Sequence, residues 1–188
     1  TGATANITNV TSFTATASSS NSGTVTISTD NSSGGTVDMT SASGNYTLNG
    51  QGSIDTLTGG GGNDIISGGT GADALSGGNG NDTITGGANN DSLTGSAGND
   101  TFNVDSGTDT ITDLGTDNDV LVVSSGATAN ATNVSSFTAT SGTSNSGTAT
   151  LTAASGGGTI NMALSSSGAY TLTGAGGADN LTGGSGAD

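Results

Sequence analysis

The sequence contains no lysine, arginine, histidine, cysteine, proline, tryptophan or glutamate, so aspartate supplies all 15 of its charged residues. Without histidine or cysteine, the chain lacks the nitrogen and sulfur ligands that zinc, copper and iron sites use. Without lysine or arginine it has no basic surface for nucleic acid, and no histidine or lysine is present to activate a serine or threonine nucleophile. We therefore expect neither an enzyme nor a nucleic-acid-binding protein. Carboxylates, hydroxyls and backbone carbonyls remain, and these are the ligands that Ca²⁺ prefers.

Large hydrophobic residues are also scarce. Apolar residues make up 29% of the chain and aromatic residues 3%, which is too little for one thick core, and the net charge is −15. This composition is typical of a disordered chain, unless bound cations neutralise the charge and the chain stacks as a solenoid with a thin core. No apolar run approaches the roughly 20 residues of a membrane span, and no signal peptide is present at Thr1. The missing initiator methionine and the ends within repeats suggest a segment of a longer chain.

Glycine and aspartate recur with a period of nine. Residues 50–112 divide into seven consecutive blocks, including GGGGNDIIS (59–67), GGTGADALS (68–76) and GGNGNDTIT (77–85). The sixth position of every block is aspartate: Asp55, Asp64, Asp73, Asp82, Asp91, Asp100 and Asp109. The eighth is a bulky apolar residue: Leu57, Ile66, Leu75, Ile84, Leu93, Phe102 and Ile111. The aspartate and the apolar residue recur together in seven consecutive blocks, which indicates a repeated structural unit rather than a flexible linker.

Each block predicts half a coil of an all-β solenoid. The glycine-rich hexapeptide forms a tight turn, because glycine adopts backbone angles that a Cβ resists. The last three residues form a short strand whose apolar side chain points inward, following the strand period of two. Two blocks make an 18-residue coil, so alternate aspartates stack on the same side. We expect a right-handed parallel β-roll with two opposite stacks, Asp55–Asp73–Asp91–Asp109 and Asp64–Asp82–Asp100.

The spacing of these stacks predicts several bound Ca²⁺ ions. Neighbouring coils lie about 4.8 Å apart, and two carboxylates at that distance repel by about 3 kcal/mol at an effective dielectric near 20. A divalent cation between the two carboxylates turns this repulsion into a net attraction, and carbonyl oxygens of the turns complete the oxygen shell of the ion. Five such gaps lie between Asp55 and Asp109, so metal binding and folding should be one event.

The block consensus G-G-x-G-x-D-x-(apolar)-x resembles the RTX family of calcium-binding nonapeptide-repeat proteins. The resemblance implies a bacterial protein that a type I secretion system exports and that folds outside the cell. Glutamine replaces glycine at position 51, serine at positions 53 and 96, and asparagine at position 89. Of these three residue types, asparagine tolerates the left-handed turn best. The block 104–112 lacks its leading glycines, which weakens the expected 91/109 site. Beyond it, Asn118 falls at the metal position and Val120 at the apolar one.

The nonapeptide blocks belong to a longer repeat with a period of about 124 residues. Residues 2–16 recur as 126–140, and a second nonapeptide block starts at Gly174. We therefore divide the chain into a Thr/Ser-rich β segment (1–49), the nonapeptide roll (50–121), a second Thr/Ser-rich segment (122–173) and a second block (174–188). The predicted metal ligands are the seven aspartates at the sixth position together with Asp179 and Asp188. Repetition at this scale is typical of tandem arrays.

The Thr/Ser-rich segments contain alternating runs that predict strands. They form either separate β-sandwiches or further solenoid coils without metal. Apolar residues continue at nine-residue spacing back from Leu57 to Leu48 and Met39, which favours the solenoid. Among the isolated acids, Asp30, Asp38, Asp105 and Asp113 are expected on the surface, as are Asp117 and Asp119, although the last two are also candidates for a calcium cap.

Three classes of function fit these observations. The first is an extracellular structural array, such as a surface layer, filament or adhesin stalk, with tandem units or copies of the same chain as partners and cell-surface polysaccharide as a further one. The second is a secretion and folding module of a larger exported enzyme or toxin. The third is an ice- or glycan-binding repeat, although Ile65, Ala74 and Asn103 interrupt its threonine rows. The 124-residue repeat favours the first.

Overall fold

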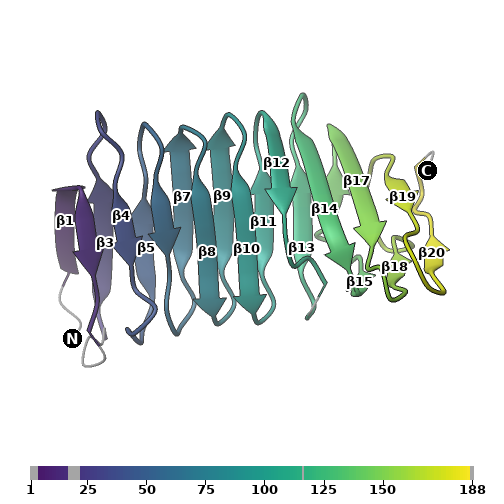
Figure 1. Ribbon diagram of the computed structural model, residues 1–188, viewed down its shortest axis with the longest axis horizontal. Helices are drawn as coiled ribbons and strands as arrows, with labels where there is room; N and C mark the ends of the chain where they lie inside the picture. The colour runs from purple at the N-terminus through teal and green to yellow at the C-terminus, as the bar shows by residue number, and fades with distance from the viewer. Residues whose placement is uncertain (1–3, 17–21, 116, 187–188) are drawn as a thin grey trace.

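The computed structural model describes residues 4–16, 22–115 and 117–186, which form an elongated solenoid of short parallel strands (Figure 1). The two ends of the chain lie at opposite ends of the long axis. The residues described contain no helix, and hence none that is long and apolar enough to span a membrane. The all-β solenoid predicted from the nonapeptides is confirmed.

Up to residue 134, successive strands alternate between two parallel sheets, which we call sheet A and sheet B. Sheet A contains β1 (Thr4–Val10), β3 (Thr24–Thr29), β5 (Tyr46–Asn49), β7 (Ile65–Thr70), β9 (Thr83–Ala88), β11 (Thr101–Val104), β13 (Val120–Val123) and β16 (Ser144–Asn145). Sheet B contains β2 (Ser12–Thr14), β4 (Thr36–Asp38), β6 (Thr56–Thr58), β8 (Ala74–Asn79), β10 (Ser92–Ala97), β12 (Thr108–Ile111), β14 (Thr128–Val134), β17 (Thr148–Ala153) and β19 (Thr171–Thr173). A third sheet, sheet C, contains β15 (Ser136–Thr138), β18 (Thr159–Asn161) and β20 (Asn180–Thr182).

The core is a thin strip between sheets A and B, formed by the apolar residue of each block. Leu48 pairs with Ile66 and Ile66 with Ile84 along sheet A, and Leu57 pairs with Leu75 along sheet B. These five side chains are at most 2% exposed. Complete burial of each stabilises the fold by about 2 kcal/mol. The register of 18 residues per coil therefore follows from the nonapeptide period.

The Thr/Ser-rich segments are further coils of the same solenoid rather than separate sandwiches. Strand β5 pairs with β7, β4 with β6 and β12 with β14, so the sheets continue through both junctions. The coils are longer here: Leu57 faces Val37, 20 residues earlier, so the expected nine-residue spacing back to Met39 is wrong. Met39 is nevertheless buried. Longer turns change the register without interrupting the core.

The second copy of the long repeat enters the solenoid half a coil out of phase. Twelve strands lie between the equivalent strands β1 and β14, and these strands alternate between the sheets, so β1 lies in sheet A and β14 in sheet B. The trio β1–β3–β5 accordingly recurs as β14–β17–β19 on the other sheet, while β15–β18–β20 repeats β2–β4–β6 as sheet C. Successive copies thus present the same side chains to opposite sides of the rod.

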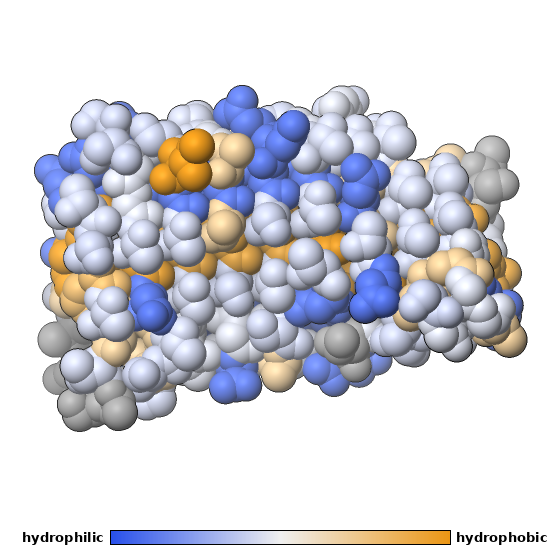
Figure 2. Space-filling model, in the orientation of Figure 1, coloured by the Kyte–Doolittle hydropathy of each residue, from blue (hydrophilic) through white to orange (hydrophobic). Residues whose placement is uncertain are grey.

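The outer face seen in Figure 2 is mostly pale, with a narrow hydrophobic seam along the long axis. The side chains that flank the inward residues are mainly threonine and serine, and they stack from coil to coil: Thr58 pairs with Ser76, and Ser76 with Thr94. The hydroxyls of Thr94 and Thr112 are 2.8 Å apart. The surface is therefore a flat, largely uncharged array of hydroxyl groups.

The four substituted glycine positions retain the turn. Asn89 has φ 85°, which confirms that asparagine preserves it, while Gln51, Ser53 and Ser96 have φ of 65°, 71° and 77°. A residue with a Cβ in this region costs about 1–2 kcal/mol. The substituted turns are therefore strained relative to glycine.

We expect Ser96→Gly to raise the free energy of unfolding by about 1 kcal/mol, because glycine adopts the left-handed φ at little cost. Thermal unfolding in saturating Ca²⁺ measures the change. The control is Ser76→Gly, which lies in the regular strand β8 and should lower the stability by about 0.5–1 kcal/mol. Equal effects at both positions would contradict the strain at Ser96.

Candidate metal centres

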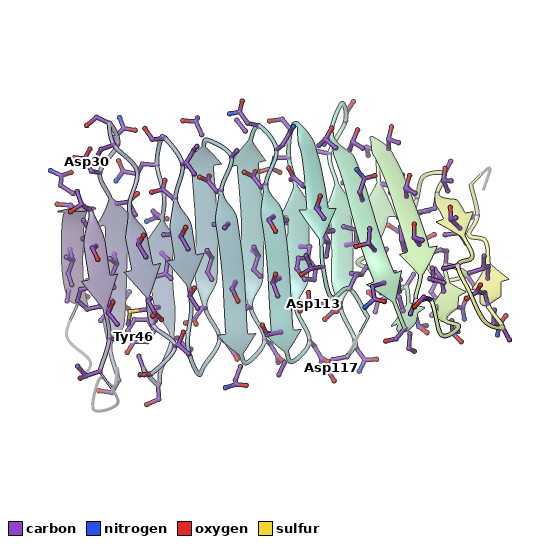
Figure 3. All side chains as sticks on the ribbon, in the orientation of Figure 1. Asp30, Tyr46, Asp113 and Asp117 are labelled. Carbon is purple, nitrogen blue, oxygen red and sulfur yellow. The ribbon has the colours of Figure 1, made fainter. Side chains whose placement is uncertain are left out.

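The predicted aspartates form two stacks along opposite long edges of the roll. One stack (Asp55, Asp73, Asp91, Asp109) lies where the chain enters sheet B, with Asp109 already in β12, and the other (Asp64, Asp82, Asp100) in the turns that lead into sheet A. Figure 3 locates these edges: Asp30 marks the first, and Tyr46 and Asp117 mark the second. All seven carboxylates are at most 3% exposed. The structure therefore brings together the aspartates in the two stacks predicted from the sequence.

One oxygen of each aspartate hydrogen-bonds to the preceding coil. The Asp73 Oδ1 accepts the Asp55 N–H at 2.8 Å, and the Asp91 Oδ1 accepts the Asp73 N–H at 2.8 Å. On the other edge the Asp82 Oδ1 accepts the Asp64 N–H at 2.7 Å. These bonds link each turn to the previous one and fix the direction in which every carboxylate reaches.

The second oxygen points into the turn and is mostly unsatisfied. Five Oδ2 atoms are buried without a hydrogen-bond partner: those of Asp55, Asp73, Asp82, Asp91 and Asp109. In the six blocks that begin with glycine, the carboxylate packs over that glycine, where a Cβ would leave no room: one built on Gly77 would lie 2.2 Å from the Asp82 Oδ2 and 2.7 Å from the Gly95 carbonyl oxygen. Asp109, whose block begins with Val104, lies instead against Gly86 of the preceding coil. Carboxylate and carbonyl oxygens thus converge on a space that only glycine keeps open.

This donor set fits Ca²⁺. An orphaned buried carboxylate oxygen is costly unless a cation or a donor satisfies it, and hard oxygen ligands are those that Ca²⁺ takes. Among the residues that the structure describes, no three acidic side chains form a metal-binding group. An ion here would therefore be held by the carboxylates of stacked coils together with backbone carbonyls, rather than by a cage of acids.

Burial changes the ionisation of both stacks. Desolvation, with like charge on the neighbouring coil adding to it, raises the pKa of Asp82 to about 6 and those of Asp100 and Asp109 to about 7. Desolvation also raises the pKa of Asp64, Asp73 and Asp91. The turns therefore hold carboxylates that resist ionisation until a cation compensates the charge.

The turn 59–64 offers a matched pair of glycine substitutions. We expect Gly59→Ala to lower the stability by about 1–3 kcal/mol and to weaken Ca²⁺ binding, because its Cβ would lie 2.2 Å from the Gly77 carbonyl oxygen and 2.3 Å from the Asp64 Oδ2. The control Gly61→Ala meets nothing closer than 3.6 Å and should change little. Calcium titration followed by circular dichroism measures both; equal effects would contradict the packing of Asp64 over Gly59.

Beyond the seventh block, Asp119 takes the metal position. The expectation that Asn118 lies there, with Val120 inward, is wrong by one residue. The surface placement of Asp119 is also wrong, whereas its role as a calcium cap stays a prediction. The Asp119 carboxylate is 2% exposed, and its Oδ1 accepts the Asp100 N–H at 3.0 Å. Leu121 pairs with Phe102 in the core, because this coil contains 19 residues rather than 18.

Two further acids of this turn bind the backbone of the coil before it. The Asp113 carboxylate accepts the N–H groups of Gly95 at 3.0 Å and Ser96 at 2.6 Å. The Asp117 Oδ2 accepts the Gly98 N–H at 3.0 Å. Sequence reasoning placed both on the surface and did not foresee these bonds, which hold the irregular turn against the last regular block.

The second block begins with a similar arrangement. Asp179 Oδ1 accepts the Gly158 N–H at 2.9 Å and its Oδ2 accepts the Ala175 N–H at 3.0 Å. This carboxylate is only partly buried. Asp188 lies outside the described residues. Asp109, whose block lacks leading glycines, is fully buried, so the weak consensus of that block does not displace its aspartate.

Sequence reasoning missed a ladder of asparagines beside the second stack. The Asn45 Oδ1 accepts the Asn63 N–H at 2.9 Å, and the pattern repeats with Asn81, Asn99 and Asn118. The signal was available, since asparagine precedes aspartate in alternate blocks. The ladder satisfies the exposed amide of the residue that precedes each stacked aspartate on this edge.

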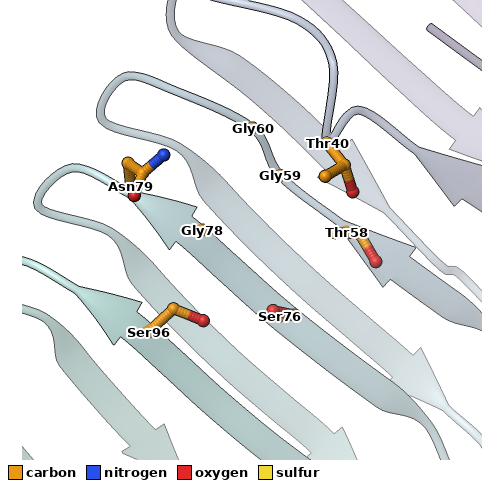
Figure 4. Close-up of a pocket in the computed structure, with 8 residues that line it drawn as sticks. All are labelled: Thr40, Thr58, Gly59, Gly60, Ser76, Gly78, Asn79 and Ser96. Atoms are coloured by element: carbon orange, nitrogen blue, oxygen red, sulfur yellow. The ribbon is translucent and has the colours of Figure 1, made fainter.

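A groove of about 290 Å³ crosses the outer face near the second edge (Figure 4). Its walls carry the side chains of Thr40, Thr58, Ser76, Asn79 and Ser96, and glycines form its floor. It is lined by hydroxyl and amide groups and contains no carboxylate. Such a surface offers hydrogen-bonding groups to a neutral polar ligand.

Comparison with known proteins gives one family. A family model described as the RTX calcium-binding nonapeptide repeat (four copies) matches residues 42–75, 76–111 and 155–188, which together exceed half of the chain. The matched ranges contain every predicted metal ligand. No curated protein and no solved structure matches the chain.

Proposed function

The chain belongs to the family of RTX calcium-binding nonapeptide-repeat proteins, and from this premise we propose that it is a non-catalytic, extracellular structural repeat protein that Ca²⁺ folds and stiffens. The observation that carries the proposal is the continuity of the sheets. Strands of the Thr/Ser-rich segments pair with nonapeptide strands at both ends of the block. Tandem units joined in this way form one rod rather than beads on a flexible linker.

Calcium supplies the stiffness in this proposal. The metal-free roll stacks buried carboxylates about 4.8 Å apart, where each pair repels by about 3 kcal/mol. Ions in these gaps link successive coils along the rod axis. In the calcium-poor interior of a bacterial cell the chain stays unfolded for type I export, and it folds in the calcium-rich exterior, as expected for the family. A calcium-stiffened rod of this kind suits a filament, an adhesin stalk or a surface layer built from tandem units.

Small-angle X-ray scattering of the 188-residue chain tests the proposal. In millimolar Ca²⁺ we expect the profile of a thin rigid rod, and in EGTA that of an expanded coil. A control in Mg²⁺ should resemble EGTA, because Mg²⁺ dehydrates reluctantly and demands octahedral geometry. A rod in all three conditions would overturn the stiffening role of calcium, whereas a compact particle in Ca²⁺ would overturn the rod.

The hydroxyl-lined outer face favours a second candidate function, binding of polysaccharide. The groove near Thr40 and Thr58 has the hydrogen-bonding character that a neutral glycan needs, and the rod repeats such a face along its length. Glycan-array binding in Ca²⁺, with Thr58→Val as the variant, tests this role; unchanged binding by that variant would exclude the groove. A secretion and folding module differs from both, since it would not require the second Thr/Ser-rich segment.

A further inference from the structure

The coil that precedes the first nonapeptide has no aspartate at the sixth position, but it keeps the backbone hydrogen bond to the next coil. Gly35 takes the place of the sixth-position residue, and its N–H donates to the Asp55 Oδ1 at 2.6 Å, as the Asp55 N–H does to Asp73 one coil later. The Asp55 Oδ2 is buried, has no hydrogen-bond partner and packs over Gly50. An unsatisfied carboxylate thus faces the last coil of the Thr/Ser-rich segment.

A threonine occupies the space that the missing carboxylate leaves. Thr29 takes the place of the first glycine in its coil, and a Cβ on Gly35 would lie 2.9 Å from the Thr29 Cγ2 and 3.0 Å from its Cβ. Thr29 is fully buried, and its hydroxyl donates to the Gly50 carbonyl oxygen. Burial raises the pKa of Asp55, and the neighbouring Thr29 hydroxyl opposes the rise. The Thr29 side chain therefore fills the space in this turn that a side chain at position 35 would otherwise occupy.

We infer that Thr29 makes the junction between the first Thr/Ser-rich segment and the nonapeptide block a further Ca²⁺ site, in which its hydroxyl replaces the carboxylate that the preceding coil lacks. The Gly50 carbonyl and the Asp55 Oδ2 are the other protein ligands of this site. The inference rests on the proposed function. It gives the first Thr/Ser-rich segment a direct share in calcium binding, so the ion orders both sides of the junction.

The second copy of the repeat supplies a natural comparison. There Ala153 stands where Thr29 stands in the first copy, since Val10 pairs with Thr29 and Val134 with Ala153. The Gly158 N–H donates to the Asp179 Oδ1 as Gly35 does to Asp55. The second junction lacks the hydroxyl, and its Asp179 Oδ2 already accepts the Ala175 N–H, so the two junctions are expected to bind calcium differently.

Calcium titration followed by backbone amide resonances tests the site in the 188-residue chain. Gly35 reports the first junction, Asp73 an interior gap and Gly158 the second junction. In the isosteric variant Thr29→Val we expect the midpoint at Gly35 to rise at least about tenfold while that at Asp73 changes less than about twofold. Thr29→Ser, which keeps the hydroxyl, should leave both midpoints within about twofold, and Ala153→Thr should lower the midpoint at Gly158.

The outcomes separate the inference from the proposed function. If no resonance responds to Ca²⁺, the proposed function fails. If Asp73 responds while Thr29→Val leaves the Gly35 midpoint unchanged, the junction site is wrong and the interior sites stand. Should the valine variant lose its fold in saturating Ca²⁺, Thr29→Ala takes its place, since alanine stands at the equivalent position 153, and an unchanged Gly35 midpoint in that variant would overturn the role of the hydroxyl.

Discussion

Removal of calcium with EGTA at pH 8 is expected to convert the far-ultraviolet circular dichroism spectrum from that of β structure to that of a disordered chain. The seven stacked aspartates of the nonapeptide block are at most 3% exposed, and at this pH their neighbours repel by about 3 kcal/mol per gap. A typical domain is stable by only about 5–15 kcal/mol, so a few unscreened gaps are enough to unfold the roll. Metal binding in the interior gaps and folding of the roll are then one transition.

Two substitutions of the same type separate this effect from general charge removal. Asp82→Asn retains an oxygen to accept the Asp64 N–H but removes a ligand charge, so the calcium midpoint should rise about tenfold or more. Asp105→Asn removes an exposed charge outside the stacks and should leave the midpoint nearly unchanged. A spectrum indifferent to EGTA would contradict coupled folding. Equal midpoints in the two variants would contradict the stacked geometry.

The nonapeptide block could be predicted from the sequence because its chemistry repeats with its geometry. A side chain that lies inward at Leu57 must do so again 18 residues later, since the parallel pairing carries the register from coil to coil. The same argument placed Asp55 over Asp73 and Asp64 over Asp82. Both the thin core and the two metal edges follow from one period.

Where turn length varies, the sequence does not determine the register. One extra residue after Ile111 moves the buried carboxylate from position 118 to Asp119, and longer turns make Val37 the partner of Leu57. Neither change in turn length alters the composition of the segment, so the change of register is seen only in the strand pairing of the structure. The half-coil offset of the second copy has the same origin, because it depends on how many strands each unit contains.

The two oxygens of each stacked aspartate have different roles. Oδ1 accepts a backbone N–H from the previous coil and is part of the fold even without metal. Oδ2 is left buried and unsatisfied in five of the seven blocks, so it is the group on which cation binding or protonation acts. Protonation of Oδ2 therefore removes part of the charge repulsion that a bound cation would otherwise neutralise.

Acid is accordingly expected to substitute in part for calcium. Burial, with like charge nearby, raises the pKa of Asp82 to about 6 and those of Asp100 and Asp109 to about 7, from an ordinary value near 3.8. The folded chain thus binds more protons than the unfolded chain between about pH 4 and pH 7. Its metal-free stability is greatest near pH 4 and falls as pH rises through 6–7, by up to about 1.4 kcal/mol per pH unit for each such carboxyl group.

With saturating Ca²⁺ the dependence reverses, because the ion binds the ionised carboxylates and protons compete with it. Thermal unfolding from pH 4 to pH 7, in EGTA and in millimolar Ca²⁺, should therefore give stabilities that change in opposite directions with pH, and by pH 8 the chain in EGTA should show no unfolding transition. A variant with Asp82, Asp100 and Asp109 all replaced by asparagine, which mimics the protonated groups, should lose most of the slope in EGTA and require more Ca²⁺ at pH 8. Parallel curves in the two media would show that the buried carboxylates do not control the stability of the metal-free roll.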